Sequence, residues 1–413
     1  MDSLEYAGSV SDAYPERGWK AYGVVVGAWF VLLPASGLLN STGIFQAWLL
    51  ENHLNKYTES EVAWIFSLFA FLFFFGGFFV GPLFDKFGSK LLLPTGTVGV
   101  VTALICASFC KSYYQYMLAF GCLGGSASSI LWTSSIATLG HWFHQNRALA
   151  TGLATTAGGV GGVVYPLMFG RLSQQVGFPW TMRCFALVST FCFGLGLSLL
   201  RTRLPRNTQA QLVLDWRGFT DRRFVLTMTA IFILDWAVLV PPAYITLYAT
   251  TENLDRVSQH ILAVLNAASI LGRSLPGFIA DKAGRFNVMI VCSAMCTLSI
   301  LGLWLFLGSR VAGLLSFAIM YGFFSGSAYS LTPVCVAQLC RTEEYASRYG
   351  TAYGVVSIAT LAGVPISGNI LRTGGGENYN ALIWFCGAAY AVSTAVFILA
   401  RGVSVGWNPT VKF

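Results

Sequence analysis

The chain has 413 residues, of which 55% are hydrophobic and 10% charged, and its formal net charge is +8. Soluble globular proteins carry about 25% charged residues, so this chain has too few to cover a surface that faces water. This composition, with a mean hydropathy of +0.64, excludes an ordinary soluble protein and indicates a chain that spans a lipid bilayer.

A helix that crosses the bilayer needs about 20 consecutive apolar residues. Charge-poor stretches of that length are apolar on all sides, unlike amphipathic soluble helices, and they lack the alternation of barrel strands. Since backbone polar groups in hydrocarbon must be paired within each segment, these stretches are expected to be helices. The sequence therefore predicts an all-α membrane protein without a soluble domain. The twelve expected spans are 21–46, 62–84, 91–110, 113–140, 148–170, 184–200, 224–251, 257–280, 288–307, 311–335, 350–371 and 380–400.

The polar stretch 201–223, with six Arg and two Asp, separates six spans from six. If both termini are cytoplasmic, the cytoplasmic segments hold 17 Lys and Arg and the outer loops hold 7, as the positive-inside rule requires. The positive charge therefore indicates orientation and not a nucleic-acid partner. The expected domains are a cytoplasmic tail at 1–20, a six-helix bundle at 21–200, a cytoplasmic loop at 201–223, a second bundle at 224–400 and a cytoplasmic tail at 401–413.

The two halves of the chain repeat each other. "GPLFDKFGSK" at 81–90 returns in a weaker form as "GFIADKAGRF" at 277–286, 196 residues later. An offset of 201 residues relates 121–130 to 322–331 and carries Arg147 to Arg348. Parallel repeats of this kind are typical of secondary transporters, so we expect two pseudo-symmetric six-helix bundles.

The repeated stretch places an Asp, basic residues and glycines at the turn between two spans. Glycine permits a tight turn and close helix approach. A carboxylate there can face the positive N-terminus of a neighbouring helix or a basic side chain. Alternatively, these residues form a solvated turn that only sets topology. The candidate residues of a conformational latch are Gly81, Asp85, Lys86, Gly88, Lys90, Arg147, Gly277, Asp281, Lys282, Gly284 and Arg285.

Asp235 and Arg273 are ionisable residues inside expected spans. A charge at mid-bilayer costs about 2.5–3.5 kcal/mol or more, so such residues usually face the bundle interior. Because both lie near mid-depth of consecutive spans, we expect a charge pair, with Asp235 as an alternative site for a coupling proton. Arg273 would anchor an anionic substrate. The alternative is that the two residues only neutralise each other and fix helix packing.

The chain resembles the major facilitator superfamily over its full length. The most specific evidence for this resemblance is the loop pattern formed by Gly81, Asp85, Lys86, Gly88 and Lys90. Within the superfamily the chain looks like the monocarboxylate porter family, and most like its fungal members. That resemblance rests on "VVVGAWFVLLPASGLLNSTGIFQAWL", "HWFHQNRALATGLATTAGGVGGVVYP" and "GRSLPGFIADKAGR".

This resemblance implies transport by alternating access, a latch that involves Asp85, a substrate-facing Arg at Arg273, and location in the plasma membrane, with an internal organelle membrane as the alternative. Arg147, which opens the fifth span, is the partner we expect for Asp85. Two positions depart from the proton-coupled monocarboxylate carriers. Asn40 replaces a Lys of the first span, and Ser269 replaces an Asp one turn before Arg273. Both replacements disfavour lactate-type proton symport and suit a larger, less charged organic molecule.

The expected substrate site combines Arg273 as anchor with Asn40 and Ser269 as neutral lining. Trp132, Tyr165 and Tyr329 are further candidates, although aromatic residues make up 15% of the chain and most would face lipid or core. The expected partners are a small organic molecule, the lipid bilayer and, as an open option, a coupling proton. We expect the protein to act as a monomer.

Other functional classes find little support. The ten cysteines lie in or beside the spans without a Cys-x-x-Cys pair, so we expect no disulfide framework and no metal site. No phosphate-binding G-x-x-x-x-G-K-[ST] loop occurs, so no nucleotide cofactor is expected. Two intramembrane charges are too few for an enzyme. Two alternatives stay open: an efflux pump for an amphipathic secondary metabolite and a nutrient receptor with a transporter fold.

Overall fold

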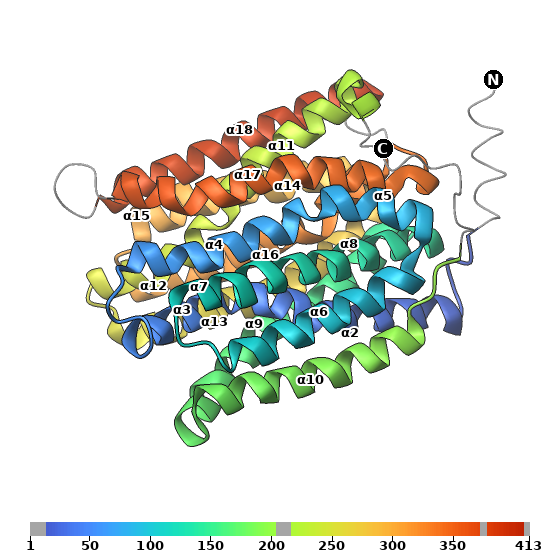
Figure 1. Cartoon of the computed structure of the whole chain (residues 1–413). Helices are drawn as coiled ribbons and strands as arrows, with labels where there is room; N and C mark the ends of the chain where they lie inside the picture. Colours follow the sequence, from blue (N-terminus) through green and yellow to red (C-terminus); the bar gives the residue numbers. More distant parts are fainter. Residues whose placement is uncertain (1–13, 204–215, 372–377, 409–413) are drawn as a thin grey trace, which may run out of the picture.

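The computed structural model describes residues 14–203, 216–371 and 378–408, and these parts are helical and contain no strand. Figure 1 shows the helices side by side along one bundle. We call α2 to α10 the N-half and η2 to α18 the C-half. The N-half contains α2 (Trp19–Asn40), α3 (Thr42–Glu51), α4 (Glu59–Phe75), α5 (Gly77–Phe87), α6 (Ser89–Ala107), α7 (Tyr113–Tyr116), η1 (Met117–Gly124), α8 (Gly125–Trp142), α9 (Arg147–Gln175) and α10 (Gly177–Leu199).

The C-half follows the stretch 204–215, which lies outside the described residues. The last helix continues to Val405, so the first residues of the expected tail at 401–413 are helical. The C-half contains η2 (Trp216–Thr220), α11 (Arg222–Val238), α12 (Val240–Thr251), α13 (Asp255–Ala283), α14 (Arg285–Leu298), η3 (Ser299–Trp304), α15 (Leu305–Leu307), α16 (Val311–Ala337), η4 (Thr342–Glu344), α17 (Tyr345–Leu371) and α18 (Tyr379–Val405).

Within the described residues, 11 helices are long and apolar enough to cross a membrane. The remaining expected span, 113–140, is the continuous helical run α7, η1 and α8. Almost every residue of α8 is buried, including its Thr residues and every Ser except Ser126. Thr138 bonds to Ser134 O at 2.7 Å, and small hydroxyl residues let neighbouring membrane helices approach closely. The predicted all-helical membrane fold is confirmed.

Local signals in the sequence set several helix ends. Thr58 and Glu61 form a reciprocal capping box at the start of α4. Gly88 ends α5 with φ +72°, and Gly284 ends α13 with φ +98°. Only glycine adopts these angles without strain. Both glycines belong to the two copies of the repeated stretch, so each copy reverses the chain between consecutive long helices.

The two halves meet along helices from the middle of each. In the N-half α2 packs on α9 and α10, and in the C-half α13 packs on α16 while α11 packs on α18. Between the halves, α9 packs on α13, and α17 packs on α4 and α5. On each side of the interface, a helix that carries a copy of the repeated stretch, α5 or α13, packs on a helix of the other half, α17 or α9.

Glycine lets the backbones of the two halves touch. A Cβ at Gly81 would lie 2.2 Å from Ala346 O, and a Cβ at Gly277 would lie 2.5 Å from Ala148 O. Ala148 is therefore the equivalent of Ala346, and Arg147 that of Tyr345. The expected equivalence of Arg147 with Arg348 is wrong, because the pairing of helices across the interface uses a different offset from the pattern in the fourth and tenth spans.

Candidate functional site

Arg273 lies on α13 at the interface of the two halves, and its side chain is only 3% exposed. Its Nη1 donates a hydrogen bond of 2.9 Å to Thr155 O on α9. Its guanidinium carbon lies 4.7 Å from the ring centroid of Tyr329 on α16. The Nε atom is buried and has no hydrogen-bond partner. A cation of the C-half thus faces the N-half with one donor unused.

Gly158 makes room for this cation. A Cβ at Gly158 would lie 2.9 Å from Arg273 Nη1 and 2.8 Å from Ser36 Oγ. Asn40 donates from Nδ2 to Gly158 O at 2.8 Å, so the predicted lining residue Asn40 lies near Arg273. Ser269 Oγ lies 3.6 Å from where a Cβ at Gly159 would stand. The structure therefore brings Asn40, Ser269 and Arg273 to one stretch of α9.

Asp235 does not form the expected ion pair with Arg273. Its Oδ2 accepts a hydrogen bond of 2.6 Å from Thr360 Oγ1 on α17, and no ion pair joins it to a described cation. The predicted charge pair is wrong because an aromatic side chain stacks on the guanidinium and a hydroxyl of another helix binds the carboxylate.

Trp132 lies at the same interface. Its Nε1 donates to Tyr349 OH on α17 at 2.7 Å, and the rings of Tyr349 and Tyr353 are 4.4 Å apart. Tyr353 OH is 2.6 Å from Thr332 Oγ1 on α16. Sequence reasoning missed this column of tyrosines. The signal was the four-residue spacing of Tyr345, Tyr349 and Tyr353, which places side chains on one helix face.

Tyr165 is not part of this cluster. Its OH is 3.2 Å from Ser189 Oγ on α10, and its ring packs edge-on against Phe185 at 4.8 Å. On the side of α2 its ring approaches Gly37. Tyr165 is therefore a packing residue inside the N-half.

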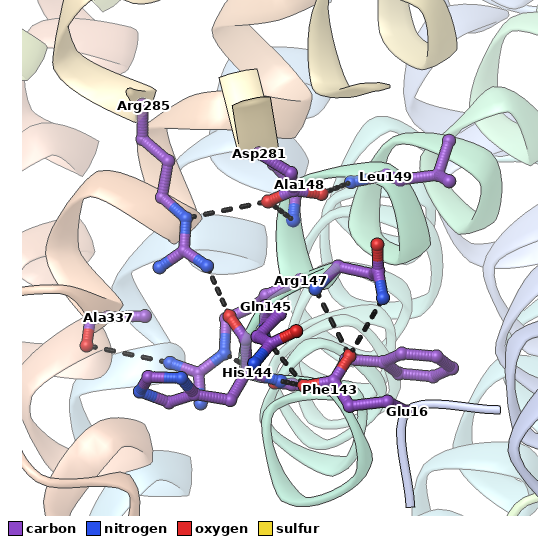
Figure 2. A network of polar contacts seen from close by, with 11 residues as sticks. Glu16, Phe143, His144, Gln145, Arg147, Ala148, Leu149, Asp281, Arg285 and Ala337 are labelled. Carbon is purple, nitrogen blue, oxygen red and sulfur yellow. Dashed lines mark hydrogen bonds and ion pairs between the residues drawn. The ribbon is translucent and has the colours of Figure 1, made fainter. Parts of the chain in front are cut away.

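The second copy of the repeated stretch caps a helix of the other half. Asp281, at the end of α13, accepts hydrogen bonds from the backbone N–H of Ala148 at 3.0 Å and of Leu149 at 2.8 Å. These groups belong to the first turn of α9, where a helix favours negative charge. Arg285 Nε lies 3.6 Å from Asp281 Oδ1 and completes an ion pair (Figure 2).

Asp85 makes the equivalent contact in the opposite direction. It lies on α5 of the N-half and accepts hydrogen bonds from Ser347 N at 2.9 Å and from Ser347 Oγ. Ser347 belongs to the first turn of α17. We call the end of the bundle that holds Asp85 and Asp281 the closed end, since both halves are joined there by these caps and by glycine contacts.

Arg147 is not the partner of Asp85, contrary to expectation. It donates to Phe143 O at 2.9 Å, to Gly140 O at 3.0 Å and to Thr342 Oγ1 at 3.2 Å. The helix N-terminus at Ser347 already binds the Asp85 carboxylate. Arg147 instead binds carbonyl oxygens at the ends of α8 and α16, the latter being Ala337 O at 3.5 Å, and the hydroxyl of Thr342 in η4.

The expected latch lysines do not contact the two carboxylates. Lys86 lies 5.8 Å from the ring centroid of Phe87, and Lys282 lies 4.0 Å from that of Phe278. Lys90 is exposed. The parts of the chain that the structure describes contain no group of three or more His, Cys, Asp or Glu that could hold a metal.

A family model described as the Major Facilitator Superfamily matches residues 21–320. An MFS-type transporter of Gibberella moniliformis is 34% identical and covers 94% of this chain and 92% of its own. Riboflavin transporter MCH5 of Saccharomyces cerevisiae is 30% identical, and the match covers 98% of this chain and 83% of the relative. The Fujikurins efflux protein of Gibberella fujikuroi is 33% identical, and the match covers 94% of this chain and 83% of the relative.

Among solved structures, the human organic anion transporter MFSD10 (TETRAN) matches with a TM-score of 0.71 over 92% of this chain and 100% of its own. The identity is 14%, so this likeness concerns the fold. These relatives and this neighbour are described as transporters.

Proposed function

The chain belongs to the Major Facilitator Superfamily, and on that premise we propose that it moves an amphipathic organic anion across a membrane by alternating access. The observation that carries this proposal is Arg273, a buried cation with an unused donor at the interface of the two halves. A substrate carboxylate or similar group would bind there.

Physical cost supports this role for Arg273. A cation at mid-bilayer costs about 2.5–3.5 kcal/mol or more, and it persists where a function requires it. Arg273 has no ion-pair partner among the described residues, and its contacts are a carbonyl oxygen and a tyrosine ring. An anionic ligand would supply the missing counter-charge. It would also accept a hydrogen bond from Nε, and a hydrogen bond between two charged groups is stronger than one between neutral groups.

The surroundings of Arg273 favour a substrate with an extended aromatic or apolar part. The ring of Tyr329 lies over the guanidinium, and Trp132, Tyr349 and Tyr353 supply further aromatic surface with hydroxyls elsewhere at the interface of the two halves. Small-molecule sites combine such apolar lining with few polar anchors. In our proposal the chain is of the monocarboxylate porter type, and Asn40 and Ser269 widen its substrate range beyond short acids.

Transport can run in either direction, as uptake or as export, and export has one observation in its favour. It is favoured by the name of one relative, an efflux protein for fujikurins, whereas riboflavin transport by another relative names no direction. In either direction the Asp85 and Asp281 caps would break when the closed end opens, and Asp235 would carry the coupling proton.

We further propose a monomer in the plasma membrane, with cytoplasmic termini and the domain boundaries expected from the sequence.

Flux in proteoliposomes tests the proposal. Purified protein would be given a panel of organic anions, from short monocarboxylates to aromatic metabolites, with and without a pH gradient. We expect an aromatic anion to be transported by wild type and to be lost in Arg273→Gln. Arg183→Gln is the matched control, since Arg183 on α10 lies against Phe109 and Trp180. Transport of the aromatic anion at equal rates by Arg273→Gln and Arg183→Gln would refute the anion anchor.

A further inference from the structure

Residues 14–17 form a short segment before α2, which we call the strap. Its centre is Glu16, whose φ is +42°, and the N–H of Arg17 donates to Pro15 O across it. A three-residue turn with positive φ is strained for a residue other than glycine. Such a conformation persists only where surrounding contacts hold it.

Four hydrogen bonds hold the carboxylate of Glu16. Its Oε1 accepts from the backbone N–H of His144 and of Gln145, each at 2.6 Å. Its Oε2 accepts from the N–H and from Nδ2 of Asn146, each at 3.1 Å. These residues form the turn between α8 and α9, and Figure 2 shows Glu16 beneath it. An ionised carboxylate makes such bonds strong.

The same turn is attached to the C-half. Arg285 on α14 donates from Nη2 to His144 O. Arg147, the first residue of α9, donates to Thr342 Oγ1 at 3.2 Å and to Ala337 O at 3.5 Å. The turn is therefore the place where the N-half and the C-half are linked outside the Asp281 cap.

The strap adds a second link across this place. Tyr14 OH is 2.7 Å from Thr342 Oγ1 in η4 of the C-half, and the Tyr14 ring lies 5.3 Å from that of His144. Arg203 lies over the Tyr14 ring at 5.3 Å. The strap thus binds the N-half through Glu16 and the C-half through Tyr14.

We propose that the strap is a clamp that holds the closed end shut. The proposal rests on alternating access as the proposed function, since opening this end separates α9 from α13. That motion breaks either the Tyr14–Thr342 contact or the four bonds of Glu16. The clamp therefore lowers the population of molecules that are open at this end, and its release raises it.

Amide hydrogen exchange of the purified full chain tests the clamp without substrate or flux. The reporters are peptides covering 147–152 and 345–350, whose N–H groups the Asp281 and Asp85 caps protect. Glu16→Ala should speed exchange in both peptides about tenfold or more, as loss of a charged hydrogen bond predicts. Tyr14→Phe, which removes the hydroxyl at Thr342, should act in the same direction. Glu51→Ala, at an exposed site on α3, is the control.

Faster exchange confined to 143–146, with both reporters unchanged, would overturn the clamp and leave Glu16 as a local anchor. Unchanged exchange in α6 checks that each variant is folded, and Glu16→Gln provides a milder change if Glu16→Ala unfolds. If the reporters respond but no substrate is transported, the proposed function fails and the clamp stands. If transport is found and the reporters do not respond, the clamp fails alone.

Discussion

Asp85 and Asp281 occupy equivalent places in the two halves, and each binds the first turn of a helix from the opposite half. Asp85 accepts from Ser347 at the start of α17, and Asp281 accepts from Ala148 and Leu149 at the start of α9. The two caps are crossed, so neither half can tilt away at this end without breaking both contacts.

Removing the charge of either Asp should weaken the closed end. Asp281→Asn and Asp85→Asn keep an acceptor but lose the interaction with the helix N-terminus, which is worth about 0.3–1 kcal/mol and up to ~2 kcal/mol when partly buried. Spin labels at Lys90→Cys and Lys282→Cys, on exposed sites of different halves, would measure the opening in a background without native cysteines. Unchanged distance distributions would show that the glycine contacts alone keep this end closed.

Gly158→Ala should impair substrate binding more than folding. The added Cβ would stand 2.9 Å from Arg273 Nη1 and 2.8 Å from Ser36 Oγ, so the guanidinium must move. Gly170→Ala in the same helix is the matched control, because a Cβ there meets nothing within 4 Å. We expect at least about tenfold weaker binding for Gly158→Ala. Equal affinity for the substrate in Gly158→Ala and Gly170→Ala would show that Arg273 does not bind the substrate.

Asp235→Asn should uncouple transport from a pH gradient. The amide oxygen can still accept from Thr360 Oγ1, so the fold is kept. Accumulation driven by a pH gradient should disappear, while exchange of labelled for unlabelled substrate continues. Asp221→Asn, at the N-cap of α11, should leave both intact. Gradient-driven accumulation that survives in Asp235→Asn would exclude this residue as the proton carrier.

The strap should be released at acid pH. Burial raises the pKa of Glu16, but the hydrogen bonds from the N–H groups of Gln145, His144 and Asn146 lower it by more. The pKa of Glu16 is therefore below its ordinary value. The ionised carboxylate therefore stabilises the closed end above about pH 4.3, and this contribution is lost as the pH falls through the lowered pKa. Exchange at 144–146, corrected for its intrinsic pH dependence, would show the loss.

Other charged groups at the strap also respond to pH. Burial lowers the pKa of His144, as do Arg147 and Arg285, while Glu16 opposes them. His144 therefore stays neutral until below its ordinary pKa of about 6.5. Glu16→Gln is the control, since an amide cannot titrate. A pH dependence that persists in Glu16→Gln would assign the effect to His144.

Local properties of the sequence determined much of this protein. Apolar length predicted the helical spans, and the repeated stretch located Asp85, Asp281 and the turn glycines Gly88 and Gly284. These features depend on consecutive residues only: the width of hydrocarbon that a helix must cross, and a backbone angle that only glycine adopts freely.

The tertiary structure decided which groups meet. Asp85 binds Ser347 and not Arg147, Asp235 binds Thr360 while Arg273 lies over Tyr329, and Tyr165 packs inside the N-half. These outcomes depend on how each helix is rotated about its axis and which distant helix it packs against. In a span that is apolar on every side, no hydrophobic stripe records that rotation, so packing between the helices alone sets it.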